Sequence, residues 1–197
     1  DPTRGRFLGR YQYVSCPYRL ARTHNYPSKY SLESETRYIY GDNPLRPIET
    51  ITYTAEKDTI RNRVKYSSDF FSQLTEYTGS DPMLVALKKM QSKGMTAIPI
   101  ETVTEKNGKI LSAQLRTFRT IPSLNDAVVP HTIKKMYLQK PISSSSFTFS
   151  GITGNQFRFD SRYEDEQIMD QYDEYLNLIQ SHDAYGNNRA VIYGYEG

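Results

Sequence analysis

The 197-residue sequence predicts a mainly β protein, an antiparallel hairpin or meander sheet with one short amphipathic helix. Three observations support this prediction. Tyrosine is abundant, with 17 residues, and it suits a strand surface on which the ring packs while its hydroxyl reaches water. Apolar residues come in short, often alternating runs. Clusters of Gly, Pro, Asn and Asp separate these runs and favour turns between strands.

The composition excludes several classes of protein. A formal net charge of +3 provides no basic surface of the kind that binds a phosphate backbone, so we expect no nucleic-acid partner. No apolar run is long enough to span a membrane, and residues 1–30 contain no signal peptide. A mature secreted chain would look the same. The single cysteine, Cys16, excludes an internal disulfide and a multi-cysteine metal site.

The first half of the chain predicts a strand followed by a hairpin. Residues 34–40 have the pattern of a strand, which Gly41-Asp42-Asn43-Pro44 would end with a turn. A β-branched, alternating run at 48–54, a turn at 55–58 and a second run at 59–66 predict a β-hairpin.

One helix is predicted next, over Asp81–Lys93. Asp81 can accept hydrogen bonds from the first amides, proline is harmless in the first turn, and Gly94 can end the helix. One face of this segment is apolar, and consists of Met83, Leu84, Leu87 and Met90. This pattern is typical of a helix that packs on a sheet.

An internal repeat links the two halves of the chain. The phrase Pro47-Ile48-Glu49-Thr50-Ile51-Thr52 recurs 52 residues later as Pro99-Ile100-Glu101-Thr102-Val103-Thr104. The second copy continues into Asn107-Gly108, a strong hairpin signal because both central positions of a type I′ turn need positive φ. We therefore expect repeat units at about 44–70 and 95–120. The isoleucines that follow the two prolines should face the same side of one sheet.

A second phrase is repeated in the C-terminal third. Tyr172-Asp173-Glu174-Tyr175-Leu176-Asn177 is followed by His182-Asp183-Ala184-Tyr185-Gly186-Asn187, and both contain Asp-x-Tyr-x-Asn. In the second copy Gly186 and Asn187 can adopt positive φ, and Asp183 can accept hydrogen bonds from the amides of the turn.

These phrases resemble those of the YD-repeat (Rhs-type) family, which comprises large secreted or surface proteins of β-hairpin repeats. The Pro-Ile-Glu-Thr strands and the ending Val191-Ile192-Tyr193-Gly194-Tyr195 are similar to the long YD-repeat proteins of Bacteroidetes. The resemblance covers about 34–197, with YD-like phrases at 171–195. The chain departs from the family at Leu176, where the family has glycine, and it lacks the long regular series of a complete shell.

The resemblance implies a fold type and a secreted or cell-surface location, and it implies no catalytic site. With the hairpin signals, it marks the positions of turns and repeat motifs as the candidate functional residues. These are Asn107, Gly108, Tyr172, Asp173, Tyr175, Asn177, Asp183, Tyr185, Gly186 and Asn187.

The segment 164–180 fits two structures. Its apolar residues Ile168, Tyr172, Tyr175, Leu176 and Ile179 have the spacing of an amphipathic helix. The YD-like phrase instead favours a strand, although alternation in this segment is poor. Both structures remain open from the residues, and the resemblance favours the strand.

No catalytic spacing is recognisable in the sequence. His24, His131 and His182 lie far apart and lack metal-binding motifs. The acidic residues near 164–173 are typical of a solvated face, because a sequence run specifies neither an opposed glycosidase pair nor a calcium loop. We therefore expect no enzyme, no cofactor and no metal site.

The function we expect is that of a non-catalytic β-repeat scaffold or interaction segment. Residues 1–197 would form one domain or a fragment of a larger array. The expected partners are neighbouring repeats, a cell-surface protein or a glycan. A glycan- or ligand-binding β-module that uses exposed tyrosines is the alternative, and a hydrolase is a distant one. A cluster of coplanar exposed tyrosines would favour glycan binding, whereas scattered tyrosines would favour the scaffold.

Overall fold

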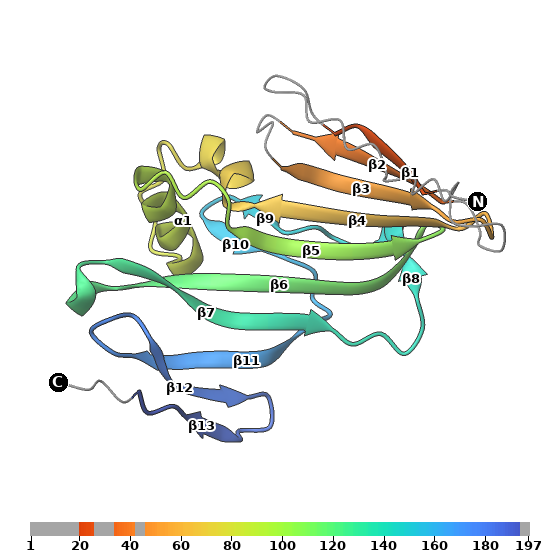
Figure 1. Cartoon of the computed structure of the whole chain (residues 1–197). Helices are drawn as coiled ribbons and strands as arrows, with labels where there is room; N and C mark the ends of the chain where they lie inside the picture. The colour runs from red at the N-terminus through yellow and green to blue at the C-terminus, as the bar shows by residue number, and fades with distance from the viewer. Residues whose placement is uncertain (1–19, 26–33, 42–45, 194–197) are drawn as a thin grey trace, which may run out of the picture.

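The computed structural model describes residues 20–25, 34–41 and 46–193. Most of their strands form one antiparallel sheet, in which the order across the sheet follows the order along the chain (Figure 1). The predicted mainly β fold of antiparallel hairpins is confirmed. From one edge to the other the strands are β1 (Arg22–Asn25), β2 (Ser34–Tyr40), β3 (Pro47–Tyr53), β4 (Thr59–Tyr66), β5 (Pro99–Lys106), β6 (Lys109–Ile121), β7 (Ala127–Met136), β11 (Tyr163–Tyr172), β12 (Leu178–Asp183) and β13 (Asn188–Ala190).

The predicted helix is present as α1 (Pro82–Ser92). Asp81 precedes it, and its Oδ1 accepts hydrogen bonds from the amides of Met83 and Leu84 at 3.0 and 3.1 Å. The apolar face is buried at Leu84, Leu87 and Met90. Among the described residues, no helix is long and apolar enough to cross a membrane.

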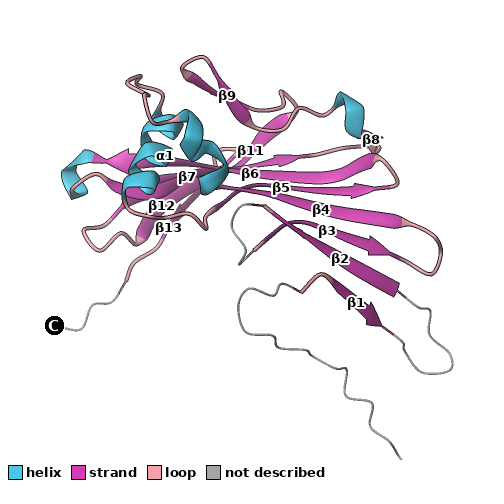
Figure 2. Cartoon of the chain, turned by 90° about the horizontal axis from the view of Figure 1, so that it is seen from above, coloured by secondary structure: helices cyan, strands magenta, loops and turns pink. Residues whose placement is uncertain are grey.

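One face of the sheet is covered, and we call it the helix face (Figure 2). Its cover consists of α1, the 3-10 helix η1 (Ser67–Gln73) and a small hairpin of β9 (Gly151–Thr153) and β10 (Gln156–Arg158). Two short 3-10 turns, η2 (Pro122–Leu124) and η3 (Ser144–Ser146), lie in connections, and β8 (Ile142–Ser143) pairs with β6. The apolar core fills the space between this cover and strands β5, β6, β7 and β11. No helix or second sheet within the described ranges covers the other side, the open face.

The register confirms that the Pro-Ile-Glu-Thr copies are equivalent in the sheet. Ile48 is an unpaired residue between two β2–β3 pairs, Ile39 with Glu49 and Tyr40 with Pro47. Ile100 occupies the same position between the β4–β5 pairs of Lys65 with Glu101 and Tyr66 with Pro99. Each isoleucine therefore forms a β-bulge at the start of its strand.

The strand residues that follow the two isoleucines present equivalent positions to the same side of the sheet. Glu49 pairs with Arg63, which in turn pairs with Val103, so all three side chains share the helix face. The burial of the two copies differs because the cover reaches only one copy. Ile100 is 1% exposed beneath it, whereas Ile48 is only half-buried.

The segment 164–180 is a strand, a turn and a strand, so its helical interpretation is wrong. Strand β11 runs to Tyr172, a turn follows at 173–177, and β12 begins at Leu178. Pairing skips Glu166 on the β7 side and Asp170 on the β12 side. These two bulges break the alternation of side chains, which explains the poor period-two pattern of the sequence.

The Asn107-Gly108 turn is confirmed, with φ of 50° and 77°. The Asn107 side chain also joins the hairpin to β4. Its Oδ1 accepts a hydrogen bond from the Thr59 amide at 2.8 Å, and its Nδ2 donates one to Asp58 Oδ1 at 2.7 Å. By contrast, the predicted turn at 41–44 lies largely outside the described residues, as does Cys16.

We predict that Gly108→Val lowers the free energy of unfolding by about 1–2 kcal/mol. A Cβ at this position would meet no atom within 4 Å, so the cost comes from the left-handed backbone and not from a clash. Urea denaturation measures the change. Lys109→Val is the matched control because it places the same side chain on the adjacent strand residue. Equal stability of the two variants would contradict the turn.

Candidate functional site

The two YD-like phrases form the same turn. The carboxylate of Asp173 accepts hydrogen bonds from the amides of Tyr175 and Asn177, at 2.9 and 2.8 Å, and from the Asn177 side chain at 3.1 Å. Asp183 accepts the three equivalent bonds from Tyr185 and Asn187, each at 2.9 Å. In each loop the aspartate carboxylate thus accepts hydrogen bonds from two backbone amides, and the asparagine side chain donates a third hydrogen bond to the same carboxylate.

Each loop needs one residue with a left-handed backbone. In the second phrase this residue is Gly186, with φ of 80°, as expected. Asn187 has no positive φ, so that part of the expectation is wrong: its amide and side chain serve Asp183 instead. In the first phrase Leu176 takes the position with φ of 68°. The hydrogen bonds of Asp173 hold a leucine in a conformation that costs about 1–2 kcal/mol.

The same loop closes the β3–β4 hairpin; the sequence predicted this hairpin but not the type of its loop. Between β3 and β4, Thr54 replaces the aspartate, and its Oγ1 accepts a hydrogen bond from the Asp58 amide at 3.2 Å. Lys57 is the left-handed residue, with φ of 63°. The loop is a three-residue turn with a bulge, a common hairpin closure that several sequences satisfy.

The tyrosines of the two phrases do not converge on one site. Tyr175 and Tyr185 lie in the turns before and after β12, at opposite ends of the strand and roughly 20 Å apart (Figure 1). They are 63% and 90% exposed. Tyr137 is also exposed, but it lies in the loop that follows β7. These three tyrosines are therefore scattered and form no shared stacking platform.

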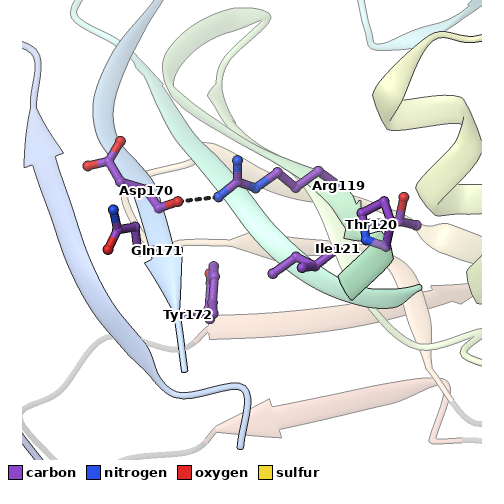
Figure 3. Close-up of a pocket in the computed structure, with 7 residues that line it drawn as sticks. Arg119, Thr120, Ile121, Asp170, Gln171 and Tyr172 are labelled. Carbon is purple, nitrogen blue, oxygen red and sulfur yellow. Dashed lines mark hydrogen bonds between the residues drawn. The ribbon is translucent and has the colours of Figure 1, made fainter. Parts of the chain in front are cut away.

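Arg119 connects strand β11 to the centre of the sheet through side-chain hydrogen bonds. It projects from β6 past β7, and its Nη2 donates to the carbonyl oxygens of Met169 and Asp170 on β11 (Figure 3). Because Asp170 is a bulge residue, its backbone has no regular partner in the ladder, and the guanidinium supplies one. Tyr172 adds a second tie by donating its hydroxyl to the Pro130 carbonyl at 2.7 Å.

A depression of about 330 Å³ lies beside these ties (Figure 3). Arg119, Ile121 and Pro122 line one side, and Asp170, Gln171 and Tyr172 line the other. Burial raises the pKa of the Tyr172 hydroxyl to about 12, so it remains a neutral donor at physiological pH. Burial, followed by the charge of Arg119, lowers the pKa of the nearby His131.

Asp170, at the rim of the depression, is paired with His182, and such a pair could serve acid–base chemistry. Asp170 Oδ2 lies 2.7 Å from His182 Nδ1, and both side chains are partly exposed. No described hydroxyl or thiol is hydrogen-bonded to the ring of His182, so the pair lacks a nucleophile of the serine-protease kind. Within the described ranges, no three His, Cys, Asp or Glu side chains could hold a metal ion together.

The buried carboxylate of Glu101 holds the covering segment on the helix face through hydrogen bonds. Glu101 is 1% exposed, and its Oε2 accepts hydrogen bonds from the amide and the hydroxyl of Ser150, both at 2.8 Å. Tyr163 donates its hydroxyl to Oε1 at 2.8 Å. Burial and the neighbouring glutamate hold the pKa of Tyr163 well above its usual range. Sequence alternation places Glu101 on the same face as Val103, and this was the signal available for its burial.

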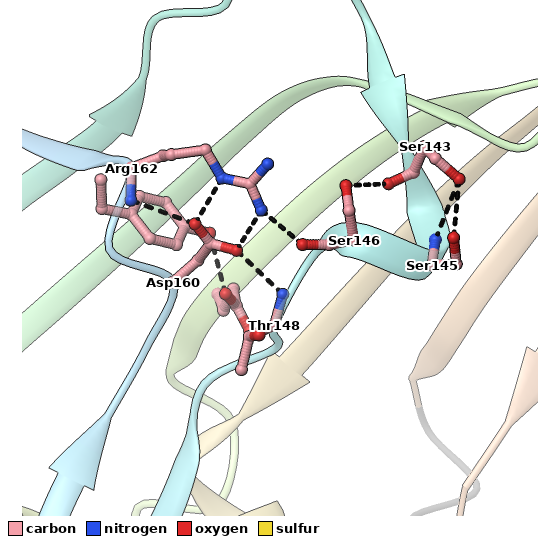
Figure 4. A network of polar contacts seen from close by, with 8 residues as sticks. Ser143, Ser145, Ser146, Thr148, Asp160 and Arg162 are labelled. Atoms are coloured by element: carbon pink, nitrogen blue, oxygen red, sulfur yellow. Dashed lines mark hydrogen bonds and ion pairs between the residues drawn. The ribbon is translucent and has the colours of Figure 1, made fainter.

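A second polar network fixes the same segment (Figure 4). Asp160 is buried, and its carboxylate accepts hydrogen bonds from the Arg162 guanidinium at 2.7 and 2.8 Å and from the Thr148 amide at 2.9 Å. Arg162 also donates to the carbonyl of Ser146. The guanidinium lowers the pKa of Asp160 to about 2.

We predict that Leu176→Gly stabilises the protein by up to about 1 kcal/mol. Glycine removes the left-handed strain, and part of the gain is offset by its greater freedom in the unfolded chain. Thermal unfolding measures the change. Gly186→Leu, the reciprocal variant in the second phrase, should destabilise. If both variants destabilise equally, Leu176 is held by contacts that outweigh its backbone strain.

We predict that the Asp160–Arg162 pair gives the protein about 2 kcal/mol of stability, lost in acid. The folded pKa is depressed from 3.8 to about 2, so the contribution is complete above about pH 4 and disappears as the pH falls through 2. Asp160→Asn should therefore be less stable than the parent at pH 6, and the difference should shrink towards pH 2. Asp126→Asn, at an exposed carboxylate, is the control. A difference that is constant with pH would contradict the assignment.

Comparisons with known proteins add no family to this geometry. No protein-family model, no curated protein and no solved structure matches the chain. The repeat family named from the motifs therefore remains an expectation. The function must be inferred from the sheet and its turns.

Proposed function

We propose that this chain is a non-catalytic β-repeat segment of a secreted or cell-surface protein, used as a scaffold and interaction surface. The single observation on which the proposal rests is the sequential sheet: each hairpin is laid beside the one before it, from β1 to β13. Such an arrangement grows by adding hairpins and needs no closed core at its edges. Recurrence of one loop at three hairpins supports the same interpretation.

The charged side chains on the uncovered part of the helix face also support a scaffold. On this part of the face, strands β3 to β5 carry a network of charges beside the buried side chain of Ile51. Glu49 lies 3.1 Å from Arg61 and 3.3 Å from Arg63, and Arg63 lies 3.4 Å from Glu105. Glu49 and the two arginines are partly exposed, so their ion pairs need no additional layer above them, whereas Glu105 is buried and its Oε2 accepts no hydrogen bond from the described residues.

The open face is polar in the same region. Thr50, Asn62, Thr104 and Ser112 are in register across β3 to β6. Thr104 donates to Asn62 Oδ1 at 2.8 Å, so part of this row is paired within itself. A sheet with two water-compatible faces suits a wall or spacer between other parts of an assembly.

The alternatives have less support. The scattered tyrosines offer no platform for a sugar, which weakens the glycan-binding alternative. The Asp170–His182 pair lacks a nucleophile, which weakens the hydrolase alternative.

We predict that the purified chain has no hydrolytic activity, contains no stoichiometric metal and binds no sugar on a glycan array. Protease treatment of intact producing cells should remove it, as expected for a surface protein. Tyr185→Ala and Tyr175→Ala should then leave every readout unchanged. A specific sugar bound at micromolar affinity and lost in these variants would replace the scaffold with the glycan-binding module. One zinc bound per chain would favour an enzyme.

A further inference from the structure

The two edges of the sheet differ in character. At the N-terminal edge, β1 is polar, and Arg22 forms an ion pair with Glu35 at 2.8 Å. Charged edges of this kind discourage pairing with other chains. At the C-terminal edge, β13 is followed by Val191 and Ile192, and Ile192 is 94% exposed. Strand β13 has no described neighbour on its outer side.

Exposed apolar side chains gather at this second edge. Ten large hydrophobic residues are exposed in the described part of the chain, and six of them lie between positions 175 and 193. Five of these six lie near the same end of β12, because Val191 and Tyr193 are hydrogen-bonded to Ile179 and Leu178; the five are Tyr175, Leu176, Val191, Ile192 and Tyr193, whereas Tyr185 lies at the other end. Clustering at a free strand edge marks an interaction surface, whereas single exposed residues carry no such meaning.

Alternate residues of β13 leave their backbone amides and carbonyls available for pairing with another strand. The Val191 amide donates to the Ile179 carbonyl at 2.9 Å, and Arg189 is paired with Ser181. Because the direction of backbone groups alternates along a strand, Arg189 and Val191 point their amides and carbonyls towards β12. Asn188, Ala190 and Ile192 therefore point theirs outward, where another strand could bond to them.

We propose that this edge is a dimerisation surface, at which β13 of a second copy pairs antiparallel with β13. The inference rests on the proposed function, because it names a partner for the interaction surface. In this register Ala190 lies on the two-fold axis opposite the partner's Ala190, and Asn188 lies opposite the partner's Ile192. The single charged residue, Arg189, faces the partner's Val191, so no charge meets a like charge.

The same features favour a second copy over an unrelated strand. The stretch 188–193 contains no proline and no lysine, the residues that most often block edge pairing. Its small central residue and uncharged ends make it complementary to itself. The paired strands would join two sheets into one. Because so short an edge buries little surface, the dimer should form only as the concentration rises.

Sedimentation velocity over a wide range of protein concentration tests the dimer. The mass of the parent chain should rise from monomer to dimer. Ala190→Pro removes an outward amide and leaves the inward bonds to β12 intact, so it should remain monomeric with an unchanged unfolding midpoint. Ile192→Lys should also remain monomeric. Tyr137→Lys, at a 60% exposed site away from the edge, should dimerise like the parent.

Cross-linking tests the register. In a Cys16→Ser background, Ala190→Cys should form a disulfide between copies on mild oxidation, because residues on the axis lie about 5.5 Å apart between Cα atoms. Asn188→Cys faces the partner's Ile192 and should cross-link far more slowly. Equal rates for the two variants would overturn the register.

The dimer and the scaffold can fail separately. A parent chain that is monomeric at every concentration, or an Ala190→Pro variant that dimerises normally, overturns the dimer. If that chain is still removed from intact cells by protease and has no activity, the scaffold stands. An enzymatic or sugar-binding activity in a chain that still dimerises through β13 overturns the scaffold and leaves the dimer in place.

Discussion

The buried carboxylate of Glu101 is the interaction on which the covered half of the sheet depends. It binds Ser150 and Tyr163, and so connects strand β5 to both ends of the segment that crosses the helix face. A carboxylate without these donors would be an uncompensated polar group in an apolar core. These hydrogen bonds hold the segment that carries Phe147 and Phe157, whose rings belong to the apolar core.

The internal repeat placed the same residue type in two environments. Glu49 and Glu101 occupy equivalent positions after equivalent bulges, yet the first binds arginines near solvent and the second is sealed beneath the cover. The chain thus uses one strand pattern twice and changes only what lies above it. The glutamate position forms ion pairs where the sheet is uncovered, and it accepts hydrogen bonds from the covering segment where the sheet is covered.

Local patterns in the sequence were sufficient for strands β2 to β6, for helix α1 and for the Asn107-Gly108 turn. Alternation located the hairpins, Asp81 and Gly94 bounded the helix, and Asn107-Gly108 fixed a turn. Contacts between residues far apart in the sequence could not be predicted from such local patterns. Nothing near Arg119 indicates that it reaches β11, and the Asp160–Arg162 network forms only once the cover is in place. Of the candidate site, sequence supplied the aspartate loops but not their positions at opposite ends of β12.

The order of strands has a consequence for how the chain acquires its structure. In most of the sheet each strand pairs with the one that leaves the ribosome just before it. Such local pairings close short loops and form quickly. Strand pairing can therefore proceed from the N-terminal end as residues emerge, whereas Glu101 must wait until Tyr163 has arrived. During that interval Glu101 lacks the Tyr163 hydrogen bond inside the core between the helix and the sheet. We expect the growing chain to be most accessible to proteases and chaperones at this stage.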